Sequence, residues 1–286
     1  MKKQIIVNID PLNLQHNVVE YAIHIARRLD LPLLLYSVQQ HVVMPVAAET
    51  GGQMLSMQEL PPDWEITVKE KAERYCEEVK RAYPNTSFEH DLGLLTDMVT
   101  SKLNYLYESV YDQSPYLLVM PKTEEYSWWN DVIGTAETAI ASESPCPVLF
   151  VPENVGTMDI NRILYLADRA SLENHDYPGF RGLRAFSANV GAKITVGFLA
   201  DELANEPFYN SGAAMELLRQ SLPEQPDHEF RFFADLEADE ILEMANLTKV
   251  DMIAFPFREA NLFKRFFENE ITRELLLKAN LPILVF

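Results

Sequence analysis

The stretch Tyr116-Leu-Leu-Val-Met-Pro121 is a short apolar run that ends in proline, and it returns later in the chain as Asp251-Met-Ile-Ala-Phe-Pro256. The stretch Pro145-Cys-Pro-Val-Leu-Phe150 returns in the same way as Asn280-Leu-Pro-Ile-Leu-Val285. Both pairs are 135 positions apart, counted between their prolines. Short, continuous apolar runs are typical of strands buried in a parallel sheet. The spacing therefore indicates that the chain contains one structural unit twice.

The first strands of the two copies match as well. Gln4–Ile9 leads into Asp10, and Arg162–Ala167 leads into Asp168, at a spacing of 158 positions. The second copy is therefore 23 residues shorter than the first (135 against 158). In both copies, buried-strand patterns alternate with amphipathic helical patterns, which predicts parallel strands joined by right-handed crossovers. Ligands bind such sheets at the carboxyl ends of the strands, near the point where the strand order turns.

We predict an α/β protein of two tandem, doubly wound, five-stranded parallel-sheet domains. Domain 1 covers residues 1–152, domain 2 covers 160–286, and 153–159 form the linker. The predicted strands are 5–9, 33–38, 87–90, 116–120 and 148–151, then 163–166, 194–198, 230–233, 252–255 and 283–286. The predicted helices are 15–29, 64–82, 97–110 and one after Gly134, then 174–189, 213–221, 239–247 and 263–278. Gly93 is expected in a turn. The two last strands are expected to pair edge to edge, which covers two exposed sheet edges.

The composition of the chain limits the partners and the kinds of site that it can have. The net charge of −19 disfavours nucleic acid and anionic membranes as partners, because both carry the same sign as the protein. The two cysteines, Cys76 and Cys146, form no C-x-x-C pair, and no run approaches the ~20 apolar residues of a membrane span. These features predict a cytoplasmic protein with reduced thiols. The six histidines show no HExxH motif, and no nucleophile–base spacing is visible, so we predict neither a metal site nor catalytic residues.

These patterns resemble the universal stress protein family in its tandem two-domain form. The resemblance covers nearly the whole chain. It lies in Asp10 and Asp168, in the strand ends 119–121 and 254–256, and in the closing stretch 145–151. It implies the adenine nucleotide alpha hydrolase-like fold, a role linked to stress survival, and dimerisation through the last strand.

The family's ATP-binding motif is largely missing from the first copy. In members that bind ATP, the fourth strand is followed by G-x-x-G, nine residues and G-[ST]. The aspartate after the first strand, Asp10 here, and a residue at the end of the second strand, near Val38, complete the pocket. Of this motif only Gly134-Thr135 is present, because Pro121 and Glu124 stand where the two earlier glycines are expected.

The second copy has lost the motif altogether, because its three positions are Pro256, Glu259 and Asn269. Both copies therefore carry P-x-x-E where nucleotide binders carry G-x-x-G. A phosphate-binding turn needs inward N–H groups and glycines with positive φ, whereas proline has no N–H and a fixed φ. A glutamate at about 4 Å from a phosphate adds repulsion of about 4 kcal/mol at an effective dielectric constant near 20. Conventional ATP binding is therefore disfavoured, more strongly in the second copy.

Two cations and two carboxylates near these positions leave alternatives open. Lys122 and Arg258 lie within the P-x-x-E elements, where they can hold phosphate by charge, pair with local carboxylates or face solvent. Asp10 and Asp168 follow the first strands, where they can face a ligand or cap the strand-to-helix turn. The candidate ligand-binding residues are Asp10, Val38, Pro121, Lys122, Glu124, Gly134, Thr135, Asp168, Pro256, Arg258 and Glu259.

Two further segments have compositions that suggest a contact with a ligand or a partner. Trp128-Trp129 follows the fourth strand, where aromatic rings can stack on a base, anchor a partner or pack between the domains. The segment 41–63 contains prolines, a glycine pair and three methionines, which is typical of a long loop. Such a loop is either a promiscuous contact surface or poorly ordered.

Two functions are compatible with these features. The first is a binding or regulatory module without a cofactor. Its two domains form an intramolecular pseudo-dimer, and its degenerate pockets serve an unknown protein partner or a small non-nucleotide ligand. The second is a nucleotide-binding protein, with slow ATPase activity left open. In that case domain 1 binds ATP or AMP through Asp10, Val38, Gly134 and Thr135, with Lys122 in place of the glycine turn. Further association of two chains as a homodimer also stays open.

Overall fold

The computed structural model describes residues 3–10, 13–40, 63–95, 115–122, 144, 146–155, 159–167, 178–199, 229–233, 238–255 and 278–286. The first half contains β1 (Gln4–Ile9), α1 (His16–Leu29), β2 (Leu33–Gln40), α2 (Trp64–Ala82), β3 (Phe88–Leu95), β4 (Pro115–Lys122) and β5 (Val148–Pro152). The second half contains β6 (Arg162–Ala167), α6 (Pro178–Val190), β7 (Lys193–Leu199), β8 (Glu229–Phe233), α8 (Ala238–Thr248), β9 (Met252–Phe255) and β10 (Ile283–Val285). The bounds of β1, α1, α2 and β9 agree with the predictions to within one residue.

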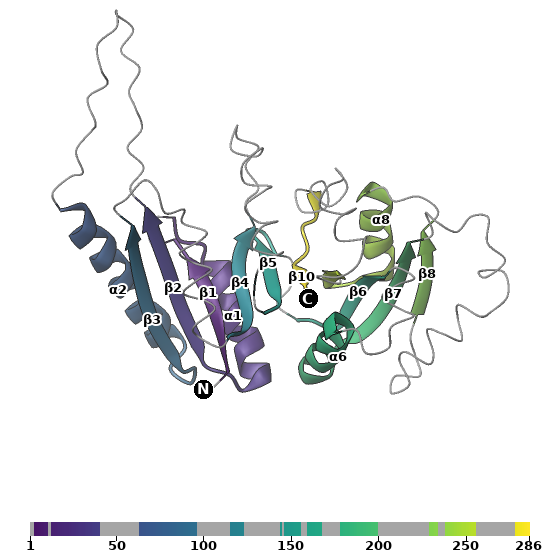
Figure 1. Cartoon of the computed structure of the whole chain (residues 1–286), viewed down its shortest axis with the longest axis horizontal. Coiled ribbons are helices and arrows are strands. Elements are labelled where there is room, and N and C mark those ends of the chain that lie inside the picture. Colours follow the sequence, from purple (N-terminus) through teal and green to yellow (C-terminus); the bar gives the residue numbers. More distant parts are fainter. Residues whose placement is uncertain are drawn as a thin grey trace, which may run out of the picture.

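The strands form one sheet in the order β3-β2-β1-β4-β5-β10-β9-β6-β7-β8. Strands of the same half pair in parallel, whereas β5 and β10 pair antiparallel, with Val148 opposite Val285 and Phe150 opposite Ile283. The two halves therefore lie side by side with β5 and β10 between them (Figure 1). The predicted edge-to-edge pairing of the last strands is confirmed.

Each half is doubly wound, as predicted. In the first half the chain runs from β1 outward through β2 to β3, and then returns to the other side of β1 to form β4 and β5. The second half repeats this order from β6 to β7 and β8, and then from β9 to β10. The strand order therefore turns twice, between β1 and β4 and between β6 and β9. These turning points are where ligands bind in open α/β sheets.

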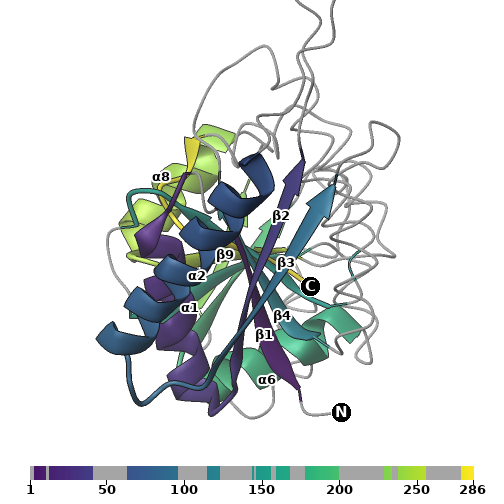
Figure 2. The same ribbon diagram turned by 90° about the vertical axis from the view of Figure 1, so that its left-hand side faces the viewer.

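Helices cover the sheet because their apolar residues recur at helical spacing. On α1 the buried positions include Val18, Ala22 and Ile25, whose i, i+4, i+7 pattern places them on one stripe of the helix. The helix α2 repeats this pattern with Val68, Ala72, Tyr75, Cys76 and Val79, and Figure 2 shows both helices on the same face of β1, β2 and β3. The helix α6 packs into the same apolar layer, whereas α8 packs against the opposite face.

Strands β2, β3 and β4 each extend at least two residues beyond a predicted end, β2 as far as Gln40. Gly93 lies within β3, opposite Val38 of β2, and not in a turn. Likewise, β4 continues beyond Met120 through Pro121 and Lys122, which pair with β5. In both cases a neighbouring strand supplies ladder partners that the local sequence does not reveal. The predicted helices 97–110 and 213–221 and the helix after Gly134 lie outside the described residues, as do 174–177 of the predicted helix 174–189 and most of 263–278. The 41–62 part of the predicted loop and Trp128-Trp129 also lie outside them.

At the junction between the two halves, side chains of α1 donate hydrogen bonds to backbone carbonyl groups. Arg28 Nη1 donates to the carbonyl oxygen of Val190 in α6 at 2.6 Å, and Arg28 Nη2 lies 3.0 Å from Asp159 Oδ1. Asn17 Nδ2 donates to the carbonyl oxygen of Pro152 at 2.7 Å and also to that of Glu153. The helix α1 therefore contacts the end of β5, the segment after it and the second half.

Two buried polar atoms of α1 at this junction have no hydrogen-bond partner among the described residues, namely Tyr21 Oη and His24 Nε2. Burial raises the pKa of the Tyr21 phenol, and the Asp251 carboxylate of the second half adds to that shift. Burial also lowers the pKa of His24, with a further contribution from Arg28. Asp159 Oδ1 lies 3.5 Å from His24 Nε2 and opposes that shift. At neutral pH both Tyr21 and His24 are therefore uncharged.

Candidate functional site

The candidate site lies where β1 and β4 diverge. Their last pair in the sheet is Val7 with Val119, so β4 continues to Pro121 without a β1 partner. A proline fits this position because it has no N–H to donate to a neighbouring strand. The gap is one of the two turning points of the strand order, at the carboxyl ends of the strands.

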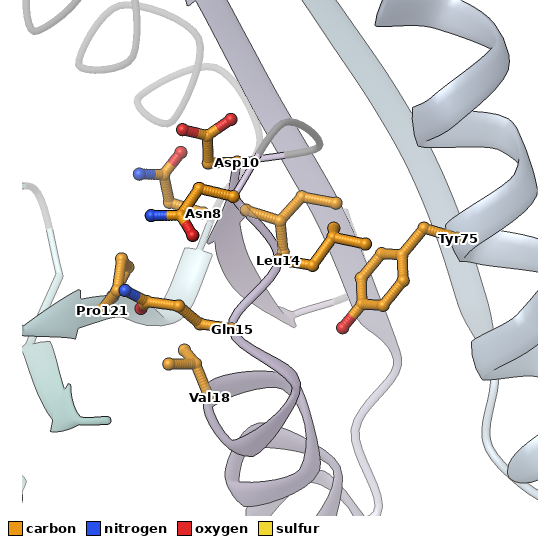
Figure 3. A pocket seen from close by; sticks show the side chains of 9 residues that line it. Asn8, Asp10, Leu14, Gln15, Val18, Tyr75 and Pro121 are labelled. Atoms are coloured by element: carbon orange, nitrogen blue, oxygen red, sulfur yellow. The ribbon is translucent and has the colours of Figure 1, made fainter. Parts of the chain in front are cut away.

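A pocket of about 160 Å³ occupies this gap. Strand β1, the turn after it, the start of α1, α2 and β4 all contribute to its lining, which consists of Asn8, Ile9, Asp10, Asn13, Leu14, Gln15, Val18, Tyr75 and Pro121. In Figure 3 the side chains of Asn8 and Gln15 reach toward Pro121, whereas Tyr75 approaches from the other side of the segment between β1 and α1. The lining therefore combines amide and carboxylate groups with apolar walls.

The turn between β1 and α1 places two of these amides. The Asp10 carbonyl oxygen accepts a hydrogen bond from the Asn13 backbone N–H at 3.1 Å, which closes the turn. Gln15 then precedes the first helical residue, with φ −104° and ψ 85°, and its side chain makes no capping hydrogen bond. Glutamine is not among the residues that cap helices well, because short side chains reach the first-turn N–H groups better. The Gln15 amide is therefore left to the pocket.

Two oxygen atoms of the lining are buried and unsatisfied. Asn8 Oδ1 and Gln15 Oε1 have no hydrogen-bond partner among the described residues. A buried acceptor without a partner costs about 1–3 kcal/mol, because its hydration is lost and not replaced. Asn8 and Gln15 line the same pocket from different elements, but these two oxygen atoms have almost no accessible surface and are not open to a molecule in the pocket.

Tyr75 supplies a rigid aromatic wall. It is 2% exposed and packs edge to face against His16 at a ring-centroid distance of 5.2 Å. Burial, with smaller contributions from Cys76 and Glu20, raises the pKa of the Tyr75 phenol. The phenol therefore stays neutral across the physiological pH range.

Lys122 does not occupy the position expected from the sequence. It is 1% exposed, and its Nζ donates to the carbonyl oxygen of Ala279 in the second half. The reason is the extension of β4, which keeps Lys122 in the sheet beside Pro152 and directs its side chain into the junction. The alternative that it faces solvent is wrong, and Lys122 is not among the described residues that line the pocket. None of those nine residues is a lysine or an arginine.

The structure brings together two of the predicted site residues, Asp10 and Pro121. Val38 lies at the expected place in β2, opposite Gly93. The remaining predicted positions lie outside the described residues, namely Glu124, Gly134, Thr135, Asp168, Pro256, Arg258 and Glu259.

The sequence analysis did not select Asn8, Gln15 and Tyr75 as site residues, yet all three line the pocket. Asn8 carries a visible signal, because it is the one polar residue within the apolar run from Ile5 to Ile9. In the part of the chain that the structure describes, no group of three or more histidine, cysteine, aspartate or glutamate side chains is arranged to hold a metal ion. No described helix combines the length and the apolarity that crossing a bilayer requires.

Solved structures share this architecture over the whole chain. A universal stress protein from Archaeoglobus fulgidus DSM 4304 matches with a TM-score of 0.69 and 11% identity, covering 99% of this chain and 96% of that one. A functionally unknown protein from Pseudomonas aeruginosa PAO1 matches with a TM-score of 0.65 and 12% identity, covering 100% and 92%. A protein described as a universal stress protein from Pseudomonas aeruginosa UCBPP-PA14 matches with a TM-score of 0.61 and 15% identity, covering 100% and 93%.

These likenesses establish the class of fold. The chain has the adenine nucleotide alpha hydrolase-like fold, in the form seen in universal stress proteins. No protein-family model matches the sequence, and no curated protein matches it either. At identities of 11–15% the similarity concerns the fold and leaves the ligand to be argued from this chain's own residues.

Proposed function

We propose that this chain is a regulatory binding protein of the universal stress protein type, located in the cytoplasm, and not an enzyme. Its domains 1–152 and 160–286 form an intramolecular pseudo-dimer joined by the linker 153–159. The pocket at Asp10 binds a small non-nucleotide ligand, and the bound state is communicated to a protein partner. The nucleotide sites of both domains are degenerate, since each carries P-x-x-E in place of the glycine turn.

The observation that carries this proposal is the chemistry of the pocket lining. Its described polar groups are the Asp10 carboxylate and the side-chain amides of Asn8, Asn13 and Gln15, with no lysine or arginine among them. A triphosphate needs cations or a nest of backbone N–H groups to balance its charge. Lys122 directly follows the lining residue Pro121 in the sequence, but its side chain is buried and donates to the Ala279 carbonyl oxygen. A ligand without phosphate suits this lining better.

Isothermal titration calorimetry with ATP and with AMP, each with and without Mg²⁺, tests the proposal. We expect no binding in the micromolar range. A micromolar Kd corresponds to about 8 kcal/mol of binding free energy, which the described lining does not supply for a phosphate. Micromolar binding of either nucleotide would overturn the proposal.

A second candidate is nucleotide binding by domain 1 alone, with ATP or AMP as the ligand. It is favoured by the location of Asp10 at the turning point of the strand order and by Gly134-Thr135 in the sequence. Asp10, Val38, Gly134 and Thr135 would then hold the nucleotide. In this case Asp10→Ala and Thr135→Val each abolish binding, and variants that bind as well as the parent protein exclude it.

A further inference from the structure

The end of β4 lies between the pocket and the second half. Pro121 and Lys122 are consecutive residues of this strand, so their side chains point to opposite faces of the sheet. Pro121 lines the pocket beside α1. Lys122 is buried on the opposite face, where its Nζ donates to the carbonyl oxygen of Ala279, a residue of the apolar layer on that face. One strand end therefore contacts the pocket with one residue and the second half with the next.

Backbone pairing holds this strand end on one side only. The pairing of β4 with β1 ends at Val119, so Pro121 and Lys122 pair with β5 alone. Their partners in β5 are Val151 and Pro152. Proline has no N–H, so neither Pro121 nor Pro152 can donate a hydrogen bond to this ladder. The position of the strand end therefore depends strongly on the side-chain contacts around it.

A side chain of α1 holds the strand end from the side of the pocket. Asn17 Nδ2 donates to the carbonyl oxygen of Pro152 at 2.7 Å. In the chain, Asn17 lies between Gln15 and Val18, which both line the pocket. The start of α1 thus bounds the pocket on one side and Pro121 bounds it on another (Figure 3). A group inserted between them acts on the distance that the Asn17 contact spans.

We propose that the end of β4 couples the pocket to the second half, so that a molecule in the pocket displaces Pro121 and weakens the junction contacts of Asn17 and Lys122. The contact between Arg28 and the Val190 carbonyl oxygen lies at the other end of α1, so it should be unaffected. This inference rests on the proposed function, because it states how occupancy of the same pocket reaches the rest of the molecule. It requires no particular chemistry of the ligand.

The experiment fills the pocket with side chains of the protein itself and follows amide hydrogen exchange in the full chain by mass spectrometry. The test variants are Leu14→Trp and Val18→Met, each of which enlarges a side chain of the lining. Leu31→Trp, at a half-buried position outside the described lining, is the matched control. The segments compared are 279–286, which contains β10, and 187–192, at the end of α6.

We expect both test variants to raise the exchange rate of 279–286 by about fivefold or more, which is the lower end of typical coupling between sites. The rate of 187–192 should stay unchanged, and the control should change neither segment. In a Lys122→Met background, Leu14→Trp should cause no further rise, because the contact that transmits the displacement is already absent.

Several outcomes would overturn the coupling. They are an unchanged rate of 279–286 in both test variants, an equal change in the control, and the full effect of Leu14→Trp in the Lys122→Met background. An equal rise in 187–192 would indicate general destabilisation and would overturn it as well. None of these results bears on the titrations with ATP and AMP, so the proposed function stands or falls separately.

Discussion

The pocket at the end of β1 and the junction between the two halves both depend on α1, but they use polar side chains differently. At the junction, Asn17 and Arg28 donate to backbone carbonyl groups, and Lys122 does the same from β4. In the pocket, Asn8 and Gln15 present acceptors that have no partner among the described residues. Satisfied polar groups stabilise the folded state, whereas unsatisfied ones destabilise it unless a ligand pairs with them. The difference separates the polar groups that stabilise the junction from the unpaired groups at the end of β1 and before α1.

The junction also contains two exceptions. Tyr21 Oη and His24 Nε2 are buried without hydrogen-bond partners in the described part of the chain, and neither residue lines the pocket. If the comparison is correct, replacing satisfied groups should destabilise the protein, and replacing these two should not.

Among the variants that test a polar contact, Lys122→Ala should have the largest effect. The substitution removes the donor to the Ala279 carbonyl oxygen and leaves a cavity where a fully buried side chain stood. We expect a loss of about 2–4 kcal/mol in the free energy of unfolding. Urea denaturation measures it as a lower midpoint, and Lys69→Ala, at an exposed position of α2, should change the midpoint very little. Equal midpoints for the two variants would contradict the assigned role of Lys122.

Arg28 tests which of its two contacts matters. Its bond to the Val190 carbonyl oxygen is 2.6 Å long, whereas its partner Asp159 is 60% exposed. Exposed ion pairs contribute only about 0.2–1 kcal/mol. We therefore expect Arg28→Ala to lose about 1–2 kcal/mol and Asp159→Ala to lose clearly less. Urea denaturation of both variants and of the double variant measures the coupling between the two side chains, and a greater loss in Asp159→Ala would refute this assignment.

The sequence predicts most of this fold because its signals are local. The buried run of β1 and the helical spacing on α1 and α2 each lie within one element, so their bounds are predicted closely. Lys122 could not be placed in this way, because its partner Ala279 lies 157 positions away. The extension of β4 that buries Lys122 depends on β5 and is equally invisible in the local pattern.

The candidate site was predictable in part. Asp10 and Pro121 came from the resemblance to a known family, and both line the pocket. Asn8 is visible in the sequence as the one polar residue in an apolar run, but only the structure shows that its side-chain oxygen has no partner among the described residues. Gln15 gave no signal, because a glutamine before a helix is chemically ordinary until its side chain is seen to make no cap.

His24 should make stability depend on pH. Burial and Arg28 lower its pKa in the folded protein, so below about pH 6.5 the unfolded chain binds more protons than the folded one. Stability should therefore decrease as the pH falls from about 7.5 to about 5.5.

The measurement for His24 is the urea midpoint at both pH values, for the parent protein and for His24→Gln. The variant should show a smaller decrease. Asp159→Ala should show a larger one, because the Asp159 carboxylate opposes the shift. Identical decreases in all three proteins would mean that the protonation of His24 does not contribute to the pH dependence of stability.

The smallest effect is expected from Tyr21→Phe, and it makes the sharpest contrast with the pocket. The Tyr21 hydroxyl is buried, and no described residue pairs with it. Removing it breaks no hydrogen bond and relieves the cost of an unsatisfied group, so the variant should be as stable as the parent or up to about 1 kcal/mol more stable. Tyr21→Ala, which also removes the ring, should lose about 3–5 kcal/mol and shows that the site is packed. Asn8→Leu should resemble Tyr21→Phe in stability, because each removes a buried polar atom that has no partner among the described residues. If Tyr21→Phe is destabilised by more than about 1 kcal/mol, its hydroxyl has a partner and is not an exception at the junction.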